Sequence, residues 1–329
     1  MEARHYQKLE TGSVQCLLCP HFCRIAPGQT GLCRVRINRG GRLEAQSYGR
    51  AVSLAMDPIE KKPLYHFYPG SKILSTGPNG CNLACSFCQN WEISQQEVKT
   101  KAVEPRQLVE LALKQRSVGI AFTYTEPLIW FEYLMDACPA ARQAGLKTVL
   151  VTNGTISQKP LKELLPHIDA MNIDLKSMDE GFYKKVCRGD LSTVLKTIEL
   201  SRRSCHIELT NLVIPGLNDS PRNMEDLVDW VCQLDPLIPL HISRYFPRYK
   251  MDTQSTPGST LKEYYNLARA KLKYVYVGNI QLEGTEDTYC PGCGQMLIKR
   301  SGYKISLDGL KGQDCKNCGR PADIIGLNG

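Results

Sequence analysis

Strand-like and helix-like runs alternate along the middle of the chain, from about residue 71 to residue 280. Amphipathic helix patterns over 105–116, 220–234 and 259–272 lie between shorter runs rich in β-branched and apolar residues. These strand-like runs cover residues 72–77, 119–124, 147–153, 170–175, 207–214, 239–245 and 274–278. Alternation of this kind is typical of strand–helix units around a parallel sheet. We therefore predict an α/β fold built as a partial, TIM-like (β/α)6 barrel.

The 15 cysteines in the 329 residues are unevenly distributed. No apolar run approaches the roughly 20 residues that cross a bilayer, and residues 1–12 lack the pattern of a signal peptide. We therefore expect a cytoplasmic protein that does not contact a membrane. Because the cytosol is reducing, metal ligation explains the cysteines better than disulfides do. The net charge of +8 is diluted by 33 acidic residues and assigns no function by itself.

Three cysteine sets suggest a division of the chain into three parts. Residues 1–70 form a cysteine-rich N-terminal module, residues 71–284 the barrel, and residues 285–329 a short tail. The sets are Cys16, Cys19, Cys23 and Cys33; Cys81, Cys85 and Cys88; and Cys290, Cys293, Cys315 and Cys318.

The central triplet, Cys81, Cys85 and Cys88, directly follows the first predicted strand, where a barrel carries its catalytic loops. Three thiolates on one loop can ligate three irons of a [4Fe–4S] cluster and leave the fourth iron open. S-adenosylmethionine (SAM) can chelate that iron, and one electron then cleaves it to a 5′-deoxyadenosyl radical. The spacing alone is also compatible with a zinc knuckle or with three buried cysteines. Polar stretches at the ends of later strands favour the cluster; they are 123–127, 152–154, 174–176, 214–216 and 277–279.

With these motifs, residues 70–280 resemble the radical SAM superfamily, in particular the branch of glycyl-radical-enzyme activases such as pyruvate formate-lyase-activating enzyme. The resemblance implies that Glu126 binds the SAM amino group and that Lys176 holds the SAM carboxylate. The backbone at Phe87 is implied to meet the adenine. Further SAM-binding positions at the strand ends are Thr152, Asn153, Asp174, Ile214 and Gly278.

Two positions depart from the activase pattern. Val151 stands where activases carry an aspartate that helps to bind a monovalent cation, so a cation site is in doubt although Thr152 and Asp174 remain. Phe246 lies near the place of an activase histidine, whose role therefore cannot be transferred.

The C-terminal cysteines form two Cys-x2-Cys-Gly knuckles, at 290–294 and 315–319. Four thiolates in this pattern suit a closed, structural zinc site, with a rubredoxin-like iron site or empty thiols as the alternatives. The N-terminal set is compatible with zinc or with an auxiliary iron–sulfur cluster, and its spacing slightly favours zinc. Of the four isolated cysteines, Cys138, Cys205 and Cys232 are predicted to be core residues. Cys187 is left open between a core position and the active site.

Three longer stretches, 16–36, 57–70 and 77–95, resemble the radical SAM member of the AmmeMemoRadiSam system. That resemblance implies Memo-like and AMMECR-like partner proteins, an electron donor such as flavodoxin or ferredoxin, and a macromolecular or partner-presented substrate. The alternatives are a glycyl-radical-enzyme activase and a zinc-ribbon nucleic-acid-binding protein. Residues 60–66 are compatible with two arrangements, a lysine-lined barrel mouth for an anionic substrate or a solvated basic loop.

Overall fold

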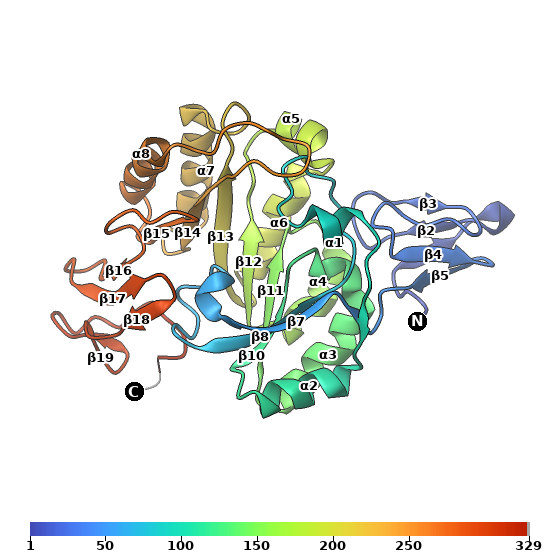
Figure 1. Ribbon diagram of the computed structural model, residues 1–329, viewed down its shortest axis with the longest axis horizontal. Coiled ribbons are helices and arrows are strands. Elements are labelled where there is room, and N and C mark those ends of the chain that lie inside the picture. Colours follow the sequence, from blue (N-terminus) through green and yellow to red (C-terminus); the bar gives the residue numbers. More distant parts are fainter. Residues whose placement is uncertain (328–329) are drawn as a thin grey trace.

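The computed structural model describes residues 1–327 and is built around one eight-stranded sheet (Figure 1). Seven strands run parallel in the order β15–β14–β13–β12–β11–β10–β8, and β7 pairs antiparallel with β8 at one edge. Within the described residues the edge strands β15 and β7 do not pair with each other, so the barrel is open. The strands are β7 (Ser53–Pro58), β8 (Lys72–Gly77), β10 (Gly119–Phe122), β11 (Lys147–Thr152), β12 (Ala170–Asp174), β13 (His206–Val213), β14 (Leu240–Arg244) and β15 (Val275–Gly278).

A helix connects each parallel strand to the next, which gives six strand–helix units followed by a seventh strand. This confirms the predicted α/β class and the partial barrel. The connecting helices are α2 (Pro105–Lys114), α3 (Phe131–Gln143), α4 (Gln158–Leu164), α6 (Leu191–Ser201), α7 (Pro221–Leu234) and α8 (Gly258–Arg269). Shorter elements in the loops are η2 (Ile59–Lys61), α1 (Trp91–Gln95), η3 (Pro127–Trp130), η4 (Leu165–His167), α5 (Glu180–Phe182) and the π-helix η5 (Tyr183–Cys187). No helix within residues 1–327 is long and apolar enough to cross a membrane.

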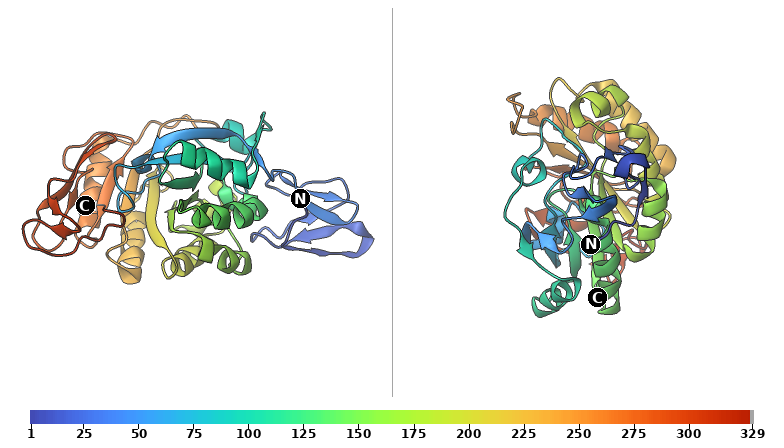
Figure 2. Two further views of the ribbon diagram at one scale, coloured as in Figure 1. Left: turned by 90° about the horizontal axis from the view of Figure 1, so that it is seen from below. Right: turned by 90° about the vertical axis from the view of Figure 1, so that its right-hand side faces the viewer.

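The N-terminal module and the C-terminal tail lie at opposite ends of the long axis (Figure 2). In the module, the buried side chain of Arg36 pairs with Glu132 of α3 at 2.7 Å and so joins the module to the barrel. The 3-10 turn η1 (Glu10–Gly12) connects the first two strands of the module. The strands of the module are β1 (Tyr6–Lys8), β2 (Val14–Cys16), β3 (Arg24–Ile25), β4 (Arg36–Arg39), β5 (Arg42–Ala45) and β6 (Arg50–Ala51), which pairs with β9 (Lys101–Ala102). The tail contains β16 (Thr288–Tyr289), β17 (Met296–Ser301), β18 (Lys304–Ser306), β19 (Leu310–Lys311) and β20 (Asp314–Cys315).

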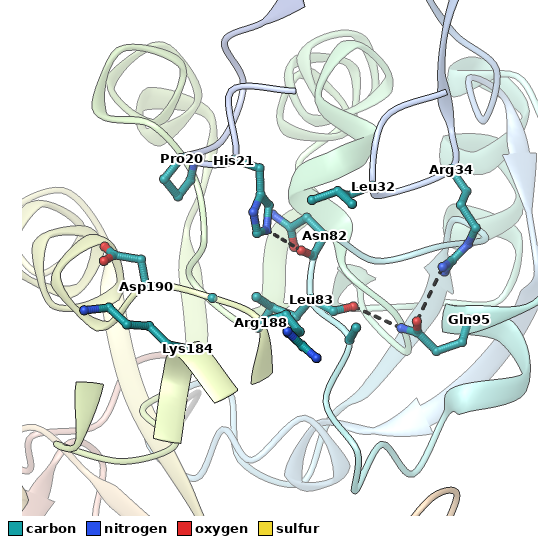
Figure 3. A pocket seen from close by; sticks show the side chains of 12 residues that line it. Pro20, His21, Leu32, Arg34, Asn82, Leu83, Gln95, Lys184, Arg188 and Asp190 are labelled. Atoms are coloured by element: carbon teal, nitrogen blue, oxygen red, sulfur yellow. Dashed lines mark hydrogen bonds between the residues drawn. The ribbon is translucent and has the colours of Figure 1, made fainter. Parts of the chain in front are cut away.

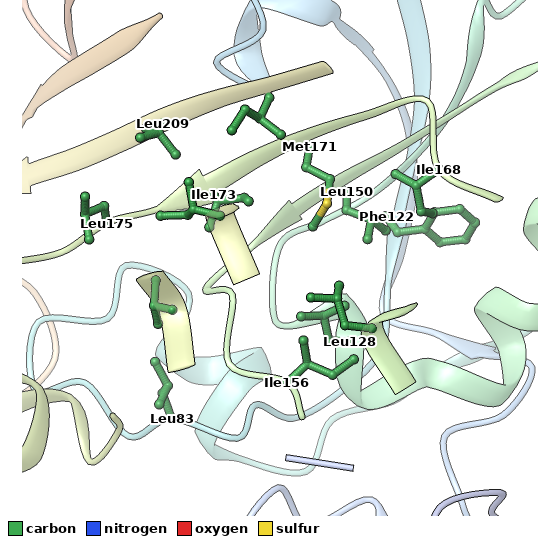
Figure 4. Packing of buried hydrophobic residues seen from close by; sticks show 14 of the residues in the cluster. Leu83, Phe122, Leu128, Leu150, Ile156, Ile168, Met171, Ile173, Leu175 and Leu209 are labelled. Carbon is green, nitrogen blue, oxygen red and sulfur yellow. The ribbon is translucent and has the colours of Figure 1, made fainter. Parts of the chain in front are cut away.

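Apolar residues fill both faces of the sheet. The outward-facing side chains of the strands, including Phe122, Leu150, Met171 and Ile173, pack against the surrounding helices and loops (Figure 4). On the inner face, Ile73, Ala121, Val149 and Ala170 pack against Ile59, Leu64 and Phe67. We call residues 59–68 the plug segment, because it fills the amino-terminal half of the barrel interior and leaves the carboxyl ends of the strands uncovered.

The predicted domain boundaries at residues 70 and 284 stay a prediction. The strand β7 lies in the first predicted segment, yet all six of its residues pair with β8. Cys138 is fully buried, as expected, whereas Cys205 and Cys232 are only partly buried.

The first prediction concerns Gly77, the last residue of β8. A Cβ at Gly77 would lie 2.0 Å from the backbone oxygen of Thr123, which a side chain cannot tolerate. Gly77→Ala should therefore lower the free energy of unfolding by about 1–3 kcal/mol or more, because the two strand ends must separate. Thermal unfolding measures the effect. The control is Gly258→Ala, whose nearest neighbours lie at 3.4 Å; equal midpoints for both variants would contradict the close approach.

Candidate functional site

A cavity of about 530 Å³ lies at the carboxyl ends of the parallel strands. Catalytic loops gather at this end of βα barrels. Three sources of lining residues meet here: the cysteine loop after β8, the ends of β10 to β14, and the plug segment. The lining includes Lys61, Lys62, Cys81, Cys85, Phe87, Cys88, Tyr124, Glu126, Val151, Thr152, Asn153, Asp174, Lys176 and Ser243.

The cysteine loop brings all three thiols of the triplet to this cavity, as predicted. The thiol of Cys81 lies 3.3 Å from the backbone nitrogen of Leu83 and 3.6 Å from Asn153 Nδ2, both of which donate to it. The thiol of Cys88 lies 3.2 Å from Ser94 Oγ. Burial raises the pKa values of Cys81 and Cys88 above the ordinary value for a thiol. Such thiols become good ligands when a cation is close enough to stabilise the thiolate.

The π-helix η5 forms hydrogen bonds with the backbone of the cysteine loop. Backbone nitrogens of Ala84 and Ser86 donate to the carbonyl oxygens of Cys187 and Val186 at 3.0 and 3.3 Å. A hydrogen bond between Cys85 and the buried Cys187, together with burial, holds the pKa of Cys85 well above its ordinary value. Cys187, which the sequence left open, therefore lies beside the cysteine loop.

Glu126 is 1% exposed and joins the end of β10 to the end of β11. Its Oε1 accepts hydrogen bonds from Thr152 Oγ1 at 2.6 Å and from the backbone nitrogen of Leu128 at 2.9 Å. Its Oε2 accepts one from the backbone nitrogen of Asn153 at 2.7 Å. A carboxylate has about four acceptor positions, so about one remains for a further donor. Burial raises the pKa of Glu126 to about 7 despite these bonds.

Lys176 lies across the cavity, with its Nζ 2.7 Å from Asp174 Oδ2 and 5.9 Å from the ring centre of Phe87. Burial alone would disfavour the ammonium, but Asp174 and Cys85 hold the pKa of Lys176 well above its ordinary value. The side chain is thus a fixed positive charge beside the cysteine loop, in place to bind an anionic group.

Two predicted positions are not among the residues that line the cavity. Ile214 is buried, and its backbone nitrogen donates to Asn218 Oδ1 at 2.6 Å. Gly278 packs against Ser243, and its neighbour Asn279 lines the cavity instead. The contacts of Ile214 and Gly278 with SAM stay predictions. Val151 lines the cavity, and the expectation that it removes the cation site of the activases also stays a prediction.

Sequence reasoning missed residues that act through hydrogen bonds. Asn82 Oδ1 accepts from Asn153 Nδ2 at 3.0 Å and so orients the amide that reaches Cys81. Tyr124 has a φ of 73° and donates its hydroxyl to Asp57 at 2.9 Å. The place of Asn82 between Cys81 and Cys85 was a usable signal, whereas nothing local to Asp57 marks it.

Residues 60–66 bring their lysines to the cavity and are not a solvated loop, because Lys62 and His66 are buried. Lys61 and Lys62 line the cavity, but both donate to Asp57, at 2.9 and 2.7 Å. His66 is buried and lies 2.6 Å from the Tyr276 hydroxyl through Nε2.

The four C-terminal thiols form a metal-ligand arrangement, because their sulfur atoms all lie within 4.8 Å of one another. Cys290 and Cys318 are 3.7 Å apart, and Cys293 and Cys315 are 3.6 Å apart. The cluster can hold a metal ion. The four N-terminal thiols line a different, much smaller cavity, together with Arg36 and Asn82.

Comparisons with known proteins agree with this geometry. The sequence profile of the Radical SAM superfamily matches residues 76–231. The "Uncharacterized protein MJ0808" of Methanocaldococcus jannaschii is 43% identical over 334 residues, which cover 98% of this chain and 99% of that protein. Pyruvate formate-lyase-activating enzyme of Clostridium pasteurianum is 25% identical over 46% of this chain and 65% of its own length. A solved radical SAM methyltransferase from Sphaerobacter thermophilus has a similar fold, with a TM-score of 0.52 and 16% identity over 64% of this chain and 67% of that one.

The second prediction tests Glu126 as the ligand of an ammonium group. Because only the carboxylate form attracts an ammonium, SAM affinity should rise from about pH 6 to about pH 7.5, with a proton released on binding, since the pKa of Glu126 in the free protein is about 7. Glu126→Gln should remove this pH dependence and weaken binding by about 1.5–3 kcal/mol.

Calorimetric titration of SAM into the anaerobic, iron-loaded protein measures both effects. Lys176→Ala should weaken SAM binding similarly, through the carboxylate. Glu163→Gln, which lies outside the cavity, is the matched control and should change neither quantity. Unchanged affinity in both Glu126→Gln and Lys176→Ala would mean that SAM binds elsewhere.

Proposed function

Because the chain belongs to the radical SAM superfamily, we propose that it cleaves SAM reductively at a [4Fe–4S] cluster on Cys81, Cys85 and Cys88. The observation that carries this proposal is the single cavity in which the three thiols meet the buried carboxylate of Glu126 and the ammonium of Lys176. Three thiols suit three irons of the cluster, and the two opposite charges suit the amino and carboxylate groups of one amino acid. The residues therefore fit the cluster and the SAM that the family implies.

When bound by the three thiols, a reduced [4Fe–4S] cluster would supply the one electron needed for reductive cleavage of SAM. The chain's own residues bind SAM and orient it in the cavity. Glu126 holds the ammonium at the end of β10, and Lys176 holds the carboxylate at the end of β12. Asn153 and Ser94, which contact the thiols of Cys81 and Cys88, fix the loop around the cluster.

The radical is directed, in this proposal, at a macromolecular or partner-presented substrate. Lys61 and Lys62 both pair with Asp57, which offsets one of their two positive charges and leaves at most one for a small anionic substrate. Partners of the Memo-like and AMMECR-like type, and a flavodoxin or ferredoxin as electron donor, rest on the sequence resemblance.

The third prediction tests the cluster. Cys81, Cys85 and Cys88 changed together to Ala should abolish dithionite-dependent formation of 5′-deoxyadenosine, because no thiolate remains to hold the irons of that cluster. Anaerobic assay with product analysis by mass spectrometry measures it, and retention of the tail metal shows that the variant is folded.

Adding the Memo-like and AMMECR-like proteins to the wild type should yield a modified macromolecule. Undiminished cleavage in the variant would refute the assignment.

Similarity to pyruvate formate-lyase-activating enzyme supports a second candidate, a glycyl-radical-enzyme activase. An activase consumes about one SAM per radical that it installs, and the partner enzyme then shows a doublet in electron paramagnetic resonance. A closed-shell modified product with repeated turnover would favour the first function over this one.

We also propose that the metal of the C-terminal cysteines is zinc. With Zn–S bonds of about 2.3 Å, the sulfur atoms of a tetrahedral site lie about 3.8 Å apart. The distances of 3.7 and 3.6 Å agree with that geometry. Four thiolates leave no open position for water or substrate, so the site is structural.

The fourth prediction follows from the structural role. Cys290 and Cys315 changed together to Ser should release about one zinc per chain and lower the thermal midpoint, because the tail has little core of its own. Metal analysis and thermal unfolding measure these effects. SAM cleavage should persist in the folded fraction. Loss of cleavage at unchanged stability and iron content would instead make the tail site catalytic.

A further inference from the structure

We propose that the four N-terminal cysteines hold a second iron–sulfur cluster and that the buried guanidinium of Arg36 balances its negative charge. The four residues, Cys16, Cys19, Cys23 and Cys33, come from three separate parts of the module: the end of β2, the turn that follows it, and the loop before β4.

The four thiols line one small cavity. All of them line a single cavity of about 20 Å³, whose other walls include Leu18, Ile25 and Ile129. A single water molecule occupies roughly 10–15 Å³. The thiols therefore surround a space larger than one water, within walls that are otherwise mostly apolar.

The spacing of the thiols distinguishes an iron–sulfur cluster site from the site of a single metal ion. Among residues 1–327, only the C-terminal set packs its ligand atoms within 4.8 Å of one another. One zinc ion with four bonds of about 2.3 Å draws the sulfur atoms together and leaves no space for a water-sized cavity. In an iron–sulfur cluster the four thiolates are distributed over two or four iron atoms. Their sulfur atoms therefore lie farther apart than around one metal ion. The N-terminal set has this wider arrangement in common with Cys81, Cys85 and Cys88.

Arg36 supplies an independent observation. Its side chain is 1% exposed and lines the cavity. Nη2 donates to both carboxylate oxygens of Glu132, at 3.0 and 2.7 Å, but Nε and Nη1 have no hydrogen-bond partner among the described residues. Leaving buried charged donors unpaired is costly. Two such donors at a cavity lined by four thiols suit an anionic group whose sulfur atoms accept hydrogen bonds.

The second site adjoins the first through Asn82. This residue directly follows Cys81 in the chain and also lines the N-terminal cavity. His21 of the N-terminal module lies against it, with Nε2 2.7 Å from the Asn82 carbonyl oxygen (Figure 3). A redox-active cluster in the module therefore lies next to the loop that carries the triplet.

The experiment removes the first site and asks what the second one holds. In the full chain with Cys81, Cys85 and Cys88 changed to Ala, anaerobic reconstitution should leave iron and acid-labile sulfide in about equal amounts, because both belong to one inorganic core. Visible absorption that bleaches with dithionite should accompany them. Changing Cys16 and Cys33 to Ser in this background should remove iron, sulfide and absorption together, while the metal of the tail remains.

Two results would overturn the proposal. One is a triplet variant that binds a second zinc and no sulfide. The other is wild-type protein that, fully reconstituted, holds only about the four irons of a single [4Fe–4S] cluster. The second measurement does not depend on the folding of any variant, and SAM cleavage enters neither readout, so failure here is distinct from failure of the proposed function.

Arg36 is tested in the triplet background through the reduction potential of the remaining cluster. Arg36→Met combined with Glu132→Gln avoids an unpaired buried carboxylate. The midpoint potential should become more negative, because a cation and its hydrogen bonds stabilise the reduced, more negative state. Arg36→Lys keeps the charge and should shift it less. An unchanged potential in the double variant would make Arg36 solely the structural partner of Glu132.

Discussion

The buried carboxylate of Glu208 holds the interior of the barrel together. From the inner face of β13 it accepts hydrogen bonds from the backbone nitrogens of Tyr65 and His66, at 3.0 and 2.7 Å, and from Nε2 of His206 and His241, at 3.1 and 2.6 Å. Burial alone would raise the pKa of Glu208, but the two histidines hold it well below its ordinary value. A carboxylate with no exposed surface is tolerated only when it is bonded in this way. The plug segment is thereby fixed to the sheet.

The position of the plug decides where chemistry can occur. Inner-facing residues near the start of the strands, such as Val149 and Ala170, are covered by it. Farther along the same strands, Val151 and Asp174 lie on the same face and line the cavity. The plug also supplies the cavity floor, since Lys62 donates to Asp57, which in turn accepts from Tyr124. A packing arrangement at one end of the barrel therefore shapes the site at the other.

The tail is connected to the same network. Arg300 Nη2 donates to the carbonyl oxygen of Tyr65 at 2.9 Å, and His66 Nδ1 lies 2.7 Å from the carbonyl oxygen of Asp323. Metal binding in a small module contributes directly to its folding free energy. A metal bound by the four C-terminal thiols would therefore stabilise the segment that contacts the plug segment, and through it the Lys62 side of the cavity.

The sequence by itself determined the strand–helix alternation and the place of the cysteine loop after β8, because periodicity and local spacing encode them. The family resemblance of two short strand-end motifs pointed to Glu126 and Lys176, which line the same cavity, while their contacts with SAM stay predictions. Only the tertiary structure decided the role of residues 59–68, whose apolar side chains and lysines suited either a loop or a lining. Glu208, Asp57 and Arg36 carry no local signal. Each has a partner that is distant in the chain: Tyr65 and His241 for Glu208, Tyr124 for Asp57 and Glu132 for Arg36. A buried charge is tolerated only where the fold brings such donors and acceptors to it.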